Sequence, residues 1–168
     1  MIIRVSSYSP ADLREYATVP SIVDTPAFSK NYDAIAEQRP LSWPERFDLS
    51  RWTFFAAIDD DGTRVGGAAV IMRAPEIEQL EQRDDLALLW DLRVAPANRR
   101  RGVGRALVER VEHWARGAGA RELKVETQDL NVGACRFYEG LGFRLSAVNA
   151  SAYAEFPDEA QMIFTKAL

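Results

Sequence analysis

The chain has 168 residues, of which 47% are hydrophobic and 27% are charged. This length and balance are typical of one globular fold, so we expect a single domain over residues 1–168 with a sizeable core. Its 25 Asp and Glu residues outnumber its 21 Lys and Arg residues, giving a formal net charge of −4 that argues against nucleic acid as a partner.

The sequence carries no targeting or membrane signal that we can identify. No apolar run approaches the length of a membrane-spanning helix, and residues 1–16 lack the apolar stretch of a signal peptide. The single cysteine, Cys135, cannot form a disulfide within the chain. We therefore expect a cytoplasmic protein that binds no membrane, and we leave a homodimer open.

The first third of the chain predicts a strand, a helix, an irregular stretch and a hairpin. Residues 2–8, IIRVSSY, are typical of an edge strand, and the sequence SPAD at 9–12 is typical of a helix start. Residues 20–50 hold four prolines among aromatic residues, which indicates short helical pieces and loops. Residues 51–58 and 64–72 flank the turn sequence DDDG, so we expect a hairpin there.

The second half predicts a strand, a helix, a strand, a helix and two closing strands. Residues 86–96 are nearly continuously apolar, which indicates a buried strand that ends at a proline. From Val103 onward, apolar residues recur at helical spacing until Gly117 and Gly119. Residues 122–128 predict a strand, 131–142 a short helix, and 143–148 and 160–168 the last two strands.

The stretch NRRRGVGRAL at 98–107 lies between the strand at 86–96 and the following helix. The first N–H groups of a helix favour an anion, and Gly102 and Gly104 would allow one to approach the backbone. A P-loop is excluded because its Gly-Lys-Ser/Thr ending is absent, and a dinucleotide fingerprint fails because position 107 is leucine. Read alone, the stretch is equally compatible with a solvated helix cap.

Two spaced motifs resemble those of one enzyme superfamily. Arg99-x-x-Gly102-x-Gly104 resembles the acetyl-CoA signature of the GCN5-related N-acetyltransferase (GNAT) superfamily. Asn131, the run ACRFY at 134–138 and the pair GF at 142–143 resemble its later motif. Residues 90–168 are also similar to streptothricin acetyltransferases and their relatives, whereas the first half agrees with the superfamily only in element order.

The resemblance implies an α/β fold with a mixed, mostly antiparallel sheet of six to seven strands and helices on both faces. It further implies that the sheet is splayed between the fourth and fifth strands, at 86–96 and 122–128. The implied activity is N-acetyl transfer from acetyl-CoA to a primary amine of a small molecule, such as a streptothricin-like antibiotic or a polyamine, by direct attack in a ternary complex. Protein lysine or N-terminal acetylation and a non-catalytic CoA-binding sensor are the alternatives.

The resemblance also implies which residues bind acetyl-CoA. The backbone edge of the strand at 92–94 and Asn131 would bind the pantetheine arm, and residues 99–105 would hold the pyrophosphate. Members commonly carry glycine where this chain has Arg100, which is its one departure from the motif. The expected cofactor-binding residues are Leu92, Arg93, Val94, Arg99, Arg100, Arg101, Gly102, Val103, Gly104, Arg105 and Asn131.

Three residues are candidates for the proton transfers. Tyr138 stands where the superfamily usually places its general acid, although it could simply be one more aromatic residue of a short helix. An amine acceptor is protonated at neutral pH, so a base would help the reaction. Glu126 and Asp91 interrupt apolar strands and are our candidates, with Glu126 ranked first; either could instead face solvent or pair with Arg93 or Lys124.

Several further residues are weighed for the acceptor site. Tyr153, Trp43, Phe47 and Trp90 could line an acceptor pocket, and the acidic run at 76–85 could attract a cation, although core packing and a solvated connector explain them equally well. His113 has no metal-spaced partner, so we expect a helix surface residue and no metal site. Cys135 has no neighbouring histidine to activate it, so we expect a small buried residue.

Overall fold

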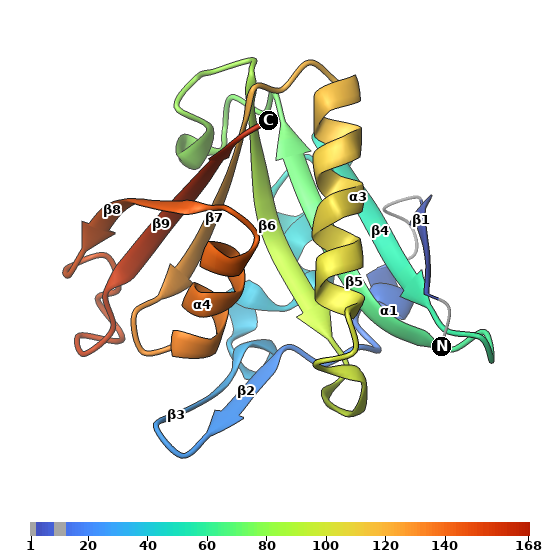
Figure 1. The fold of residues 1–168 in the computed structure, drawn as a ribbon. Helices are drawn as coiled ribbons and strands as arrows, with labels where there is room; N and C mark the ends of the chain where they lie inside the picture. The colour runs from blue at the N-terminus through green and yellow to red at the C-terminus, as the bar shows by residue number, and fades with distance from the viewer. Residues whose placement is uncertain (1–2, 9–12) are drawn as a thin grey trace.

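The structure, a computed structural model, describes residues 3–8 and 13–168 (Figure 1). The helix start predicted at 9–12 lies outside the described residues, and helix α1 is described over Leu13–Tyr16. A seven-stranded sheet forms the centre of the molecule, in the order β1-β4-β5-β6-β7-β9-β8. Its strands are β1 Arg4–Tyr8, β4 Trp52–Ile58, β5 Arg64–Met72, β6 Leu86–Val94, β7 Glu122–Gln128, β8 Arg144–Asn149 and β9 Gln161–Ala167.

Every strand pair in this sheet is antiparallel except β6 with β7. The parallel pair follows from the helix α3 (Val103–Gly117), which crosses one face of the sheet and returns the chain to the same end. The predicted α/β fold with a mixed, mostly antiparallel sheet is therefore confirmed, as is the hairpin formed by β4 and β5.

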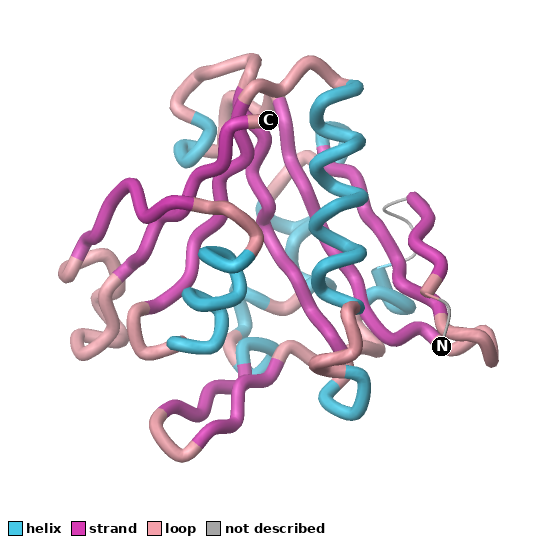
Figure 2. Tube along the Cα trace, viewed as in Figure 1, coloured by secondary structure: helices cyan, strands magenta, loops and turns pink. Residues whose placement is uncertain are grey.

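The stretch 20–50 differs from its prediction in one respect. It contains the short hairpin of β2 (Ile22–Thr25) and β3 (Phe28–Asn31), which Figure 2 shows as a separate ribbon beside the main sheet. These strands have no apolar alternation, and only Phe28 is buried, so no period-two signal marks them in the sequence. The rest is the predicted short helical pieces: α2 (Trp43–Arg46) and 3-10 turns at Tyr32–Ala34, Ala36–Gln38, Pro40–Ser42 and Leu49–Arg51.

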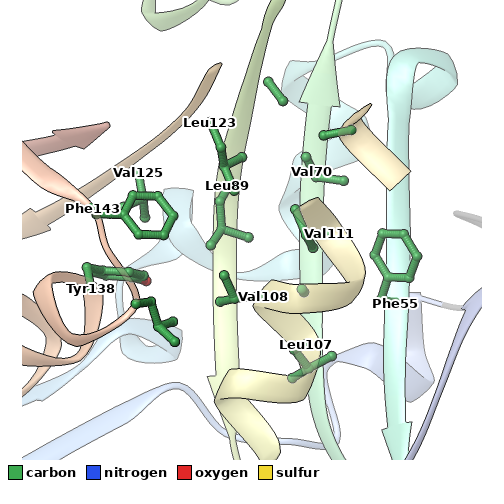
Figure 3. Packing of buried hydrophobic residues seen from close by; sticks show 14 of the residues in the cluster. Phe55, Val70, Leu89, Leu107, Val108, Val111, Leu123, Val125, Tyr138 and Phe143 are labelled. Carbon is green, nitrogen blue, oxygen red and sulfur yellow. The ribbon is translucent and has the colours of Figure 1, made fainter. Parts of the chain in front are cut away.

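Helices cover both faces of the sheet, as predicted. On one face, α3 and α4 (Val132–Gly140) pack over β4 to β7 and bury the cluster drawn in Figure 3. Alternate residues of β4, β5 and β6 point to the other face of the sheet, where they pack with α1 and α2 around Tyr16 and Trp43. Because successive strand residues point to opposite faces, one set of strands supplies both cores.

Helix α3 shows why this arrangement is stable. Its apolar positions Val103, Leu107 and Val111 are at most 1% exposed, whereas Arg105 and Glu109 on the opposite side are exposed. The helix ends at Gly117, and two residues later Gly119 takes a positive φ of 92°. The remaining 3-10 turns, Glu78–Leu80 and Pro96–Asn98, connect strands to the elements that follow them.

Candidate active site

The sheet opens between β6 and β7. Their parallel ladder joins Leu86–Leu89 to Glu122–Val125 and goes no further, although β6 continues to Val94 and β7 to Gln128. Beyond the ladder, β7 stays paired with β9, and β6 stays paired with β5 as far as Val94. The facing edges of β6 and β7 therefore diverge and leave backbone groups without strand partners, as predicted for the fourth and fifth strands.

A β-bulge coincides with the start of this opening. Ala69 of β5 pairs with Asp91, but the next residue, Val70, pairs with Leu89, so Trp90 is an extra residue in β6. A bulge bends its strand and increases the local twist. The sequence did not reveal it, because its position depends on the register between two distant strands.

The junction between β6 and α3 matches the expected anion-binding geometry. Gly102 is the N-cap of α3 with a φ of 84°, and a Cβ there would meet no atom of the described residues within 4 Å. As a glycine, it supplies no side-chain cap to the first N–H groups of α3, and the helix dipole makes this terminus favourable for an anion. Arg100 has a φ of 59°, in the left-handed region that glycine adopts readily, so the departure from the motif is compatible with the backbone path that a glycine would take.

Gly104 also has a packing role that the sequence did not predict. A Cβ at Gly104 would lie 3.1 Å from the Phe137 ring and 3.7 Å from Val94. This glycine therefore allows α3 to pack closely against α4, besides lying in the first turn of α3. A larger residue at position 104 would disturb the contact between the two helices as well as any ligand at the helix terminus.

The arginines of this junction divide into one anchored residue and several exposed ones. Arg99 donates to the Val94 carbonyl at 3.1 Å and to the Ile22 carbonyl, which ties the β2–β3 hairpin to the end of β6. Arg100 and Arg101 are exposed, and Arg105 lies 3.9 Å from Glu109 in a solvent-exposed pair. The exposed side chains can therefore add positive charge beside the helix terminus without a fixed position.

Tyr138 is held in α4 by aromatic neighbours and is 6% exposed. Its ring lies 5.3 to 6.2 Å from those of Phe137, Phe143 and Phe164. In Figure 3 the phenol oxygen of Tyr138 points from α4 toward β6. Burial, with smaller effects from Asp91, Tyr32 and Cys135, raises the pKa of Tyr138, so the phenol stays protonated.

The hydroxyl of Tyr138 has no hydrogen-bond partner among the described residues. Among the described residues this oxygen is not one of the fully buried polar atoms without a partner, so it reaches accessible space at the edge of the aromatic cluster. A transferable proton and a hydrogen-bond donor are therefore available beside the open edge of β6.

A cavity of about 330 Å³ lies at the opening. Its inner wall is formed by Leu88, Leu89 and Trp90 of β6 and by residues of β7. Of the residues predicted for an acceptor pocket, Trp43, Trp90 and Tyr153 line this cavity, whereas Phe47 lies behind Trp90 at a ring distance of 5.3 Å. The further lining residues are Tyr32, Glu37, Gln38, Arg46, Gln79, Asp91, Glu126 and Gln128.

Both candidate bases line the cavity, but their carboxylates differ in availability. Asp91 accepts from Arg93 through both oxygens, at 2.7 and 3.1 Å, and from the Tyr16 hydroxyl at 2.5 Å. Arg93 is 2% exposed and also donates to the Val19 carbonyl and to Asp33. The electrostatic attraction of Asp91 and Asp33 offsets the desolvation of this guanidinium, and its pKa is raised. Asp91 is thus the centre of a buried ion-pair cluster.

Glu126 makes one hydrogen bond among the described residues, accepting from Tyr153 through Oε1 at 2.6 Å. Its second oxygen, Oε2, carries no hydrogen bond within that part of the chain. Burial and this contact with Glu126 raise the pKa of Tyr153, which therefore remains a donor. A carboxylate with one fixed oxygen and one open oxygen can accept a proton from a molecule in the cavity.

The remaining predicted residues have identifiable places. Leu92 and Val94 lie on the β6 segment beyond the ladder with β7, and both are partly buried. Asn131 is the N-cap of α4, where its side chain accepts from the Ala134 N–H at 3.2 Å. Burial raises the pKa of the Tyr32 phenol to about 12, and the polar side chain of Asn131 offsets part of that effect.

Other candidates from the sequence lie away from the cavity. None of the acidic residues at 76–85 lines it; within that run Asp85 pairs with Arg83 at 3.0 Å and Glu81 with Lys124 at 3.2 Å. His113 is exposed on α3, as expected. Burial raises the pKa of the half-buried Cys135 thiol. Among residues 3–8 and 13–168, no three His, Cys, Asp or Glu side chains could share a metal ion, and no helix is apolar and long enough to cross a membrane.

Sequence reasoning missed three polar residues of this region: Tyr16, Tyr32 and Gln128. Tyr16 reaches Asp91 from α1, and Tyr32 donates to the Gln128 side chain from the segment after β3. The only available signal in the sequence was the run VETQ at 125–128, which contains Gln128. The two tyrosines are 75 and 96 residues from their partners, so nothing local marked them.

Comparisons with known proteins identify the family and the fold of this chain. A sequence model described as the acetyltransferase (GNAT) family matches residues 23–143. Streptothricin acetyltransferase A of Bacillus subtilis is 41% identical over 71 residues, which cover 42% of this chain and 41% of the relative. Aminoglycoside N(6')-acetyltransferase type 1 of Klebsiella aerogenes is 38% identical over 87 residues, covering 52% of this chain and 56% of the relative.

A solved structure from Bacillus anthracis, in complex with acetyl coenzyme A, has a TM-score of 0.75 and 19% identity. That alignment covers 100% of this chain and 99% of the other, and it shows a shared fold. The chain spans about half the length of the curated relatives that it matches. The similarity in sequence is thus concentrated in part of each relative, whereas the similarity in fold extends over the whole chain.

Proposed function

Because the chain belongs to the acetyltransferase (GNAT) family, we propose that it transfers the acetyl group of acetyl-CoA to a primary amine of a small cationic molecule. The observation that carries this proposal is the opening between β6 and β7, which has the unpaired Tyr138 hydroxyl beside it and the Glu126 carboxylate in its cavity. We further propose that residues 1–168 act as a single domain, because both cores pack on one sheet.

The chain offers a fitting place for acetyl-CoA. Open N–H groups at the start of α3, with Gly102 in the left-handed conformation and exposed arginines beside it, would hold the pyrophosphate. The unpaired edge of β6 at Leu92 to Val94 would pair with the amides of the pantetheine arm. When bound, acetyl-CoA supplies a thioester carbonyl for the amine to attack and a thiolate as leaving group.

Two side chains would handle the protons of a direct attack. Glu126, through its open Oε2, would accept a proton from the ammonium group of the acceptor, so that the neutral amine can form the new C–N bond. Tyr138 would donate its phenol proton to the sulfur as the C–S bond breaks. Burial keeps that phenol protonated, and the same apolar surroundings would raise the pKa of a thiol formed beside it.

The cavity supports a small acceptor. Its volume of about 330 Å³ is at the lower end of small-molecule sites. The indole of Trp90 and the carboxylates of Glu37 and Glu126 line the cavity and provide surroundings that favour a cation. The names of the relatives, streptothricin acetyltransferase and aminoglycoside N(6')-acetyltransferase, support an antibiotic-like amine.

An assay of CoA release with acetyl-CoA and a panel of amines tests the proposal. Streptothricin, an aminoglycoside and spermidine represent small cations, and a lysine-containing peptide represents protein acetylation. We expect release with at least one small cation and little with the peptide. Release with the peptide alone would favour protein acetylation, and tight acetyl-CoA binding without release on any amine would favour a non-catalytic CoA-binding module.

A further inference from the structure

We infer that Tyr32, Gln128 and Tyr153 form a one-directional chain of hydrogen bonds that positions Glu126 to accept a proton from the acceptor amine. This inference rests on the function proposed above and assigns positioning residues to that site.

The chain begins at Tyr32, in the segment after β3. Tyr32 donates its proton to Oε1 of Gln128. Because this amide oxygen accepts, the NH₂ group of Gln128 is left to donate onward. The hydrogen bond from Tyr32 therefore sets the orientation of the Gln128 side chain.

The second half of the chain continues in the same direction. With Oε1 of Gln128 occupied by Tyr32, its Nε2 faces Tyr153 and donates to that phenol at 3.3 Å. Tyr153 then donates to Oε1 of Glu126 at 2.6 Å. Every donor points toward the carboxylate, and hydrogen bonds aligned in this way strengthen one another.

The segments that carry the chain are held in place independently of it. Lys30 of β3 and Glu159 form an ion pair of 2.6 Å whose side chains are each 9% exposed, and Lys30 also lies 3.9 Å above the Phe156 ring. This pair joins the hairpin that precedes Tyr32 to the connection that carries Tyr153. Gln128, between them, is 9% exposed. The chain therefore passes through one buried side chain, Gln128, and the half-buried Tyr32, Tyr153 and Glu126.

The alignment has a chemical consequence for Glu126. The hydrogen bond from Tyr153 fixes Oε1, which leaves Oε2 as the oxygen available to an acceptor in the cavity that Glu126 lines. The other ionisable or charged groups around this cavity are Asp91, Glu37 and Arg46. Asp91 is bound by Arg93 and Tyr16, and Arg46 donates to the Glu37 carbonyl at the exposed mouth, so Tyr153 is the group that contacts Glu126 directly.

Nuclear magnetic resonance of protein labelled at tyrosine Cζ tests the chain without any acceptor. In Glu126→Gln, the terminal acceptor loses its charge, so we expect the Tyr153 resonance to shift and the Tyr32 resonance to shift by a smaller amount. Tyr16, which bonds to Asp91 instead, serves as the matched control and should not move. An unmoved Tyr32 resonance would overturn the cooperative chain, even if Tyr153 responds.

Kinetics with the amine that gives the fastest CoA release test the positioning role. Tyr153→Phe should lower kcat about tenfold and leave the KM for acetyl-CoA unchanged. Tyr32→Phe should lower kcat by a smaller factor, again without changing that KM. An undiminished kcat in Tyr153→Phe, or a loss of kcat matched by an equal rise in the KM for acetyl-CoA, would overturn the positioning role. Failure of every amine would instead count against the proposed function, while the resonance shifts would still report the chain.

Discussion

Replacing Tyr138 with phenylalanine separates a catalytic hydroxyl from a structural one. The ring of Tyr138 packs against three phenylalanines, but its hydroxyl has no hydrogen-bond partner in the described part of the chain. Tyr138→Phe therefore removes no hydrogen bond and keeps the apolar contacts. We expect the free energy of unfolding to change by no more than about 0.5 kcal/mol.

The same change should strongly reduce turnover. A positioned general acid contributes roughly 10²- to 10⁴-fold to a rate, which corresponds to about 3 to 5 kcal/mol in the activation barrier. CoA release measured with a thiol-reactive dye should show this loss in kcat, while acetyl-CoA affinity measured by calorimetry stays nearly constant. Urea unfolding of the same preparation gives the stability change.

Tyr16→Phe is the matched control, because it removes a hydroxyl that donates to the Asp91 carboxylate at 2.5 Å. Loss of a hydrogen bond to a charged group should lower the unfolding free energy by about 1.5 to 3 kcal/mol. For a chain of this size that corresponds to a fall of roughly 3 to 12 °C in Tm. An undiminished kcat in Tyr138→Phe would refute the acid role, and a large loss of stability would show that the hydroxyl has a structural partner.

Three further experiments test the packing at Gly67, the backbone conformation at Arg100 and the titration of Tyr32. Gly67→Ala would place a Cβ 2.6 Å from the buried Tyr16 ring and should lower the unfolding free energy by about 1 to 3 kcal/mol. Gly133→Ala in α4 is the control, because its Cβ would meet nothing within 4 Å and the change should be neutral or stabilising. Equal effects of the two changes in urea titrations would contradict this expectation. Arg100→Gly should be tolerated, but Arg100→Val should cost about 1 kcal/mol, because a β-branched residue disfavours a φ of 59°; equal stabilities in the same titrations would argue against that backbone conformation. Burial raises the pKa of Tyr32 to about 12. The neutral phenol therefore contributes its full stabilisation below about pH 10, and this stabilisation is lost as the pH rises toward 12. Urea unfolding midpoints that stay constant from pH 9 to pH 12 would contradict this expectation.

The main helices and strands after residue 50, and the family of the chain, could be predicted from the sequence alone. Apolar periodicity at Val103, Leu107 and Val111 marked the buried face of α3, and the turn at 59–62 marked the β4–β5 hairpin. The motif at 99–104 and the later motif ending at Phe143 indicated the GNAT family, whose sequence model matches residues 23–143. These features are local, so the order of residues along the chain is enough to reveal them.

The different roles of the polar residues depend on the tertiary structure. In sequence, Asp91 and Glu126 each interrupt an apolar strand, and Glu126 ranks only slightly ahead of Asp91. In the fold, Asp91 is occupied by Arg93 and Tyr16, whereas Glu126 receives one hydrogen bond from Tyr153 and keeps an open oxygen. The bulge at Trp90 and the contact of Gly104 with Phe137 could likewise not be predicted from the sequence. Each depends on strand register or on side chains from distant segments, and residue spacing along the chain carries no record of such contacts.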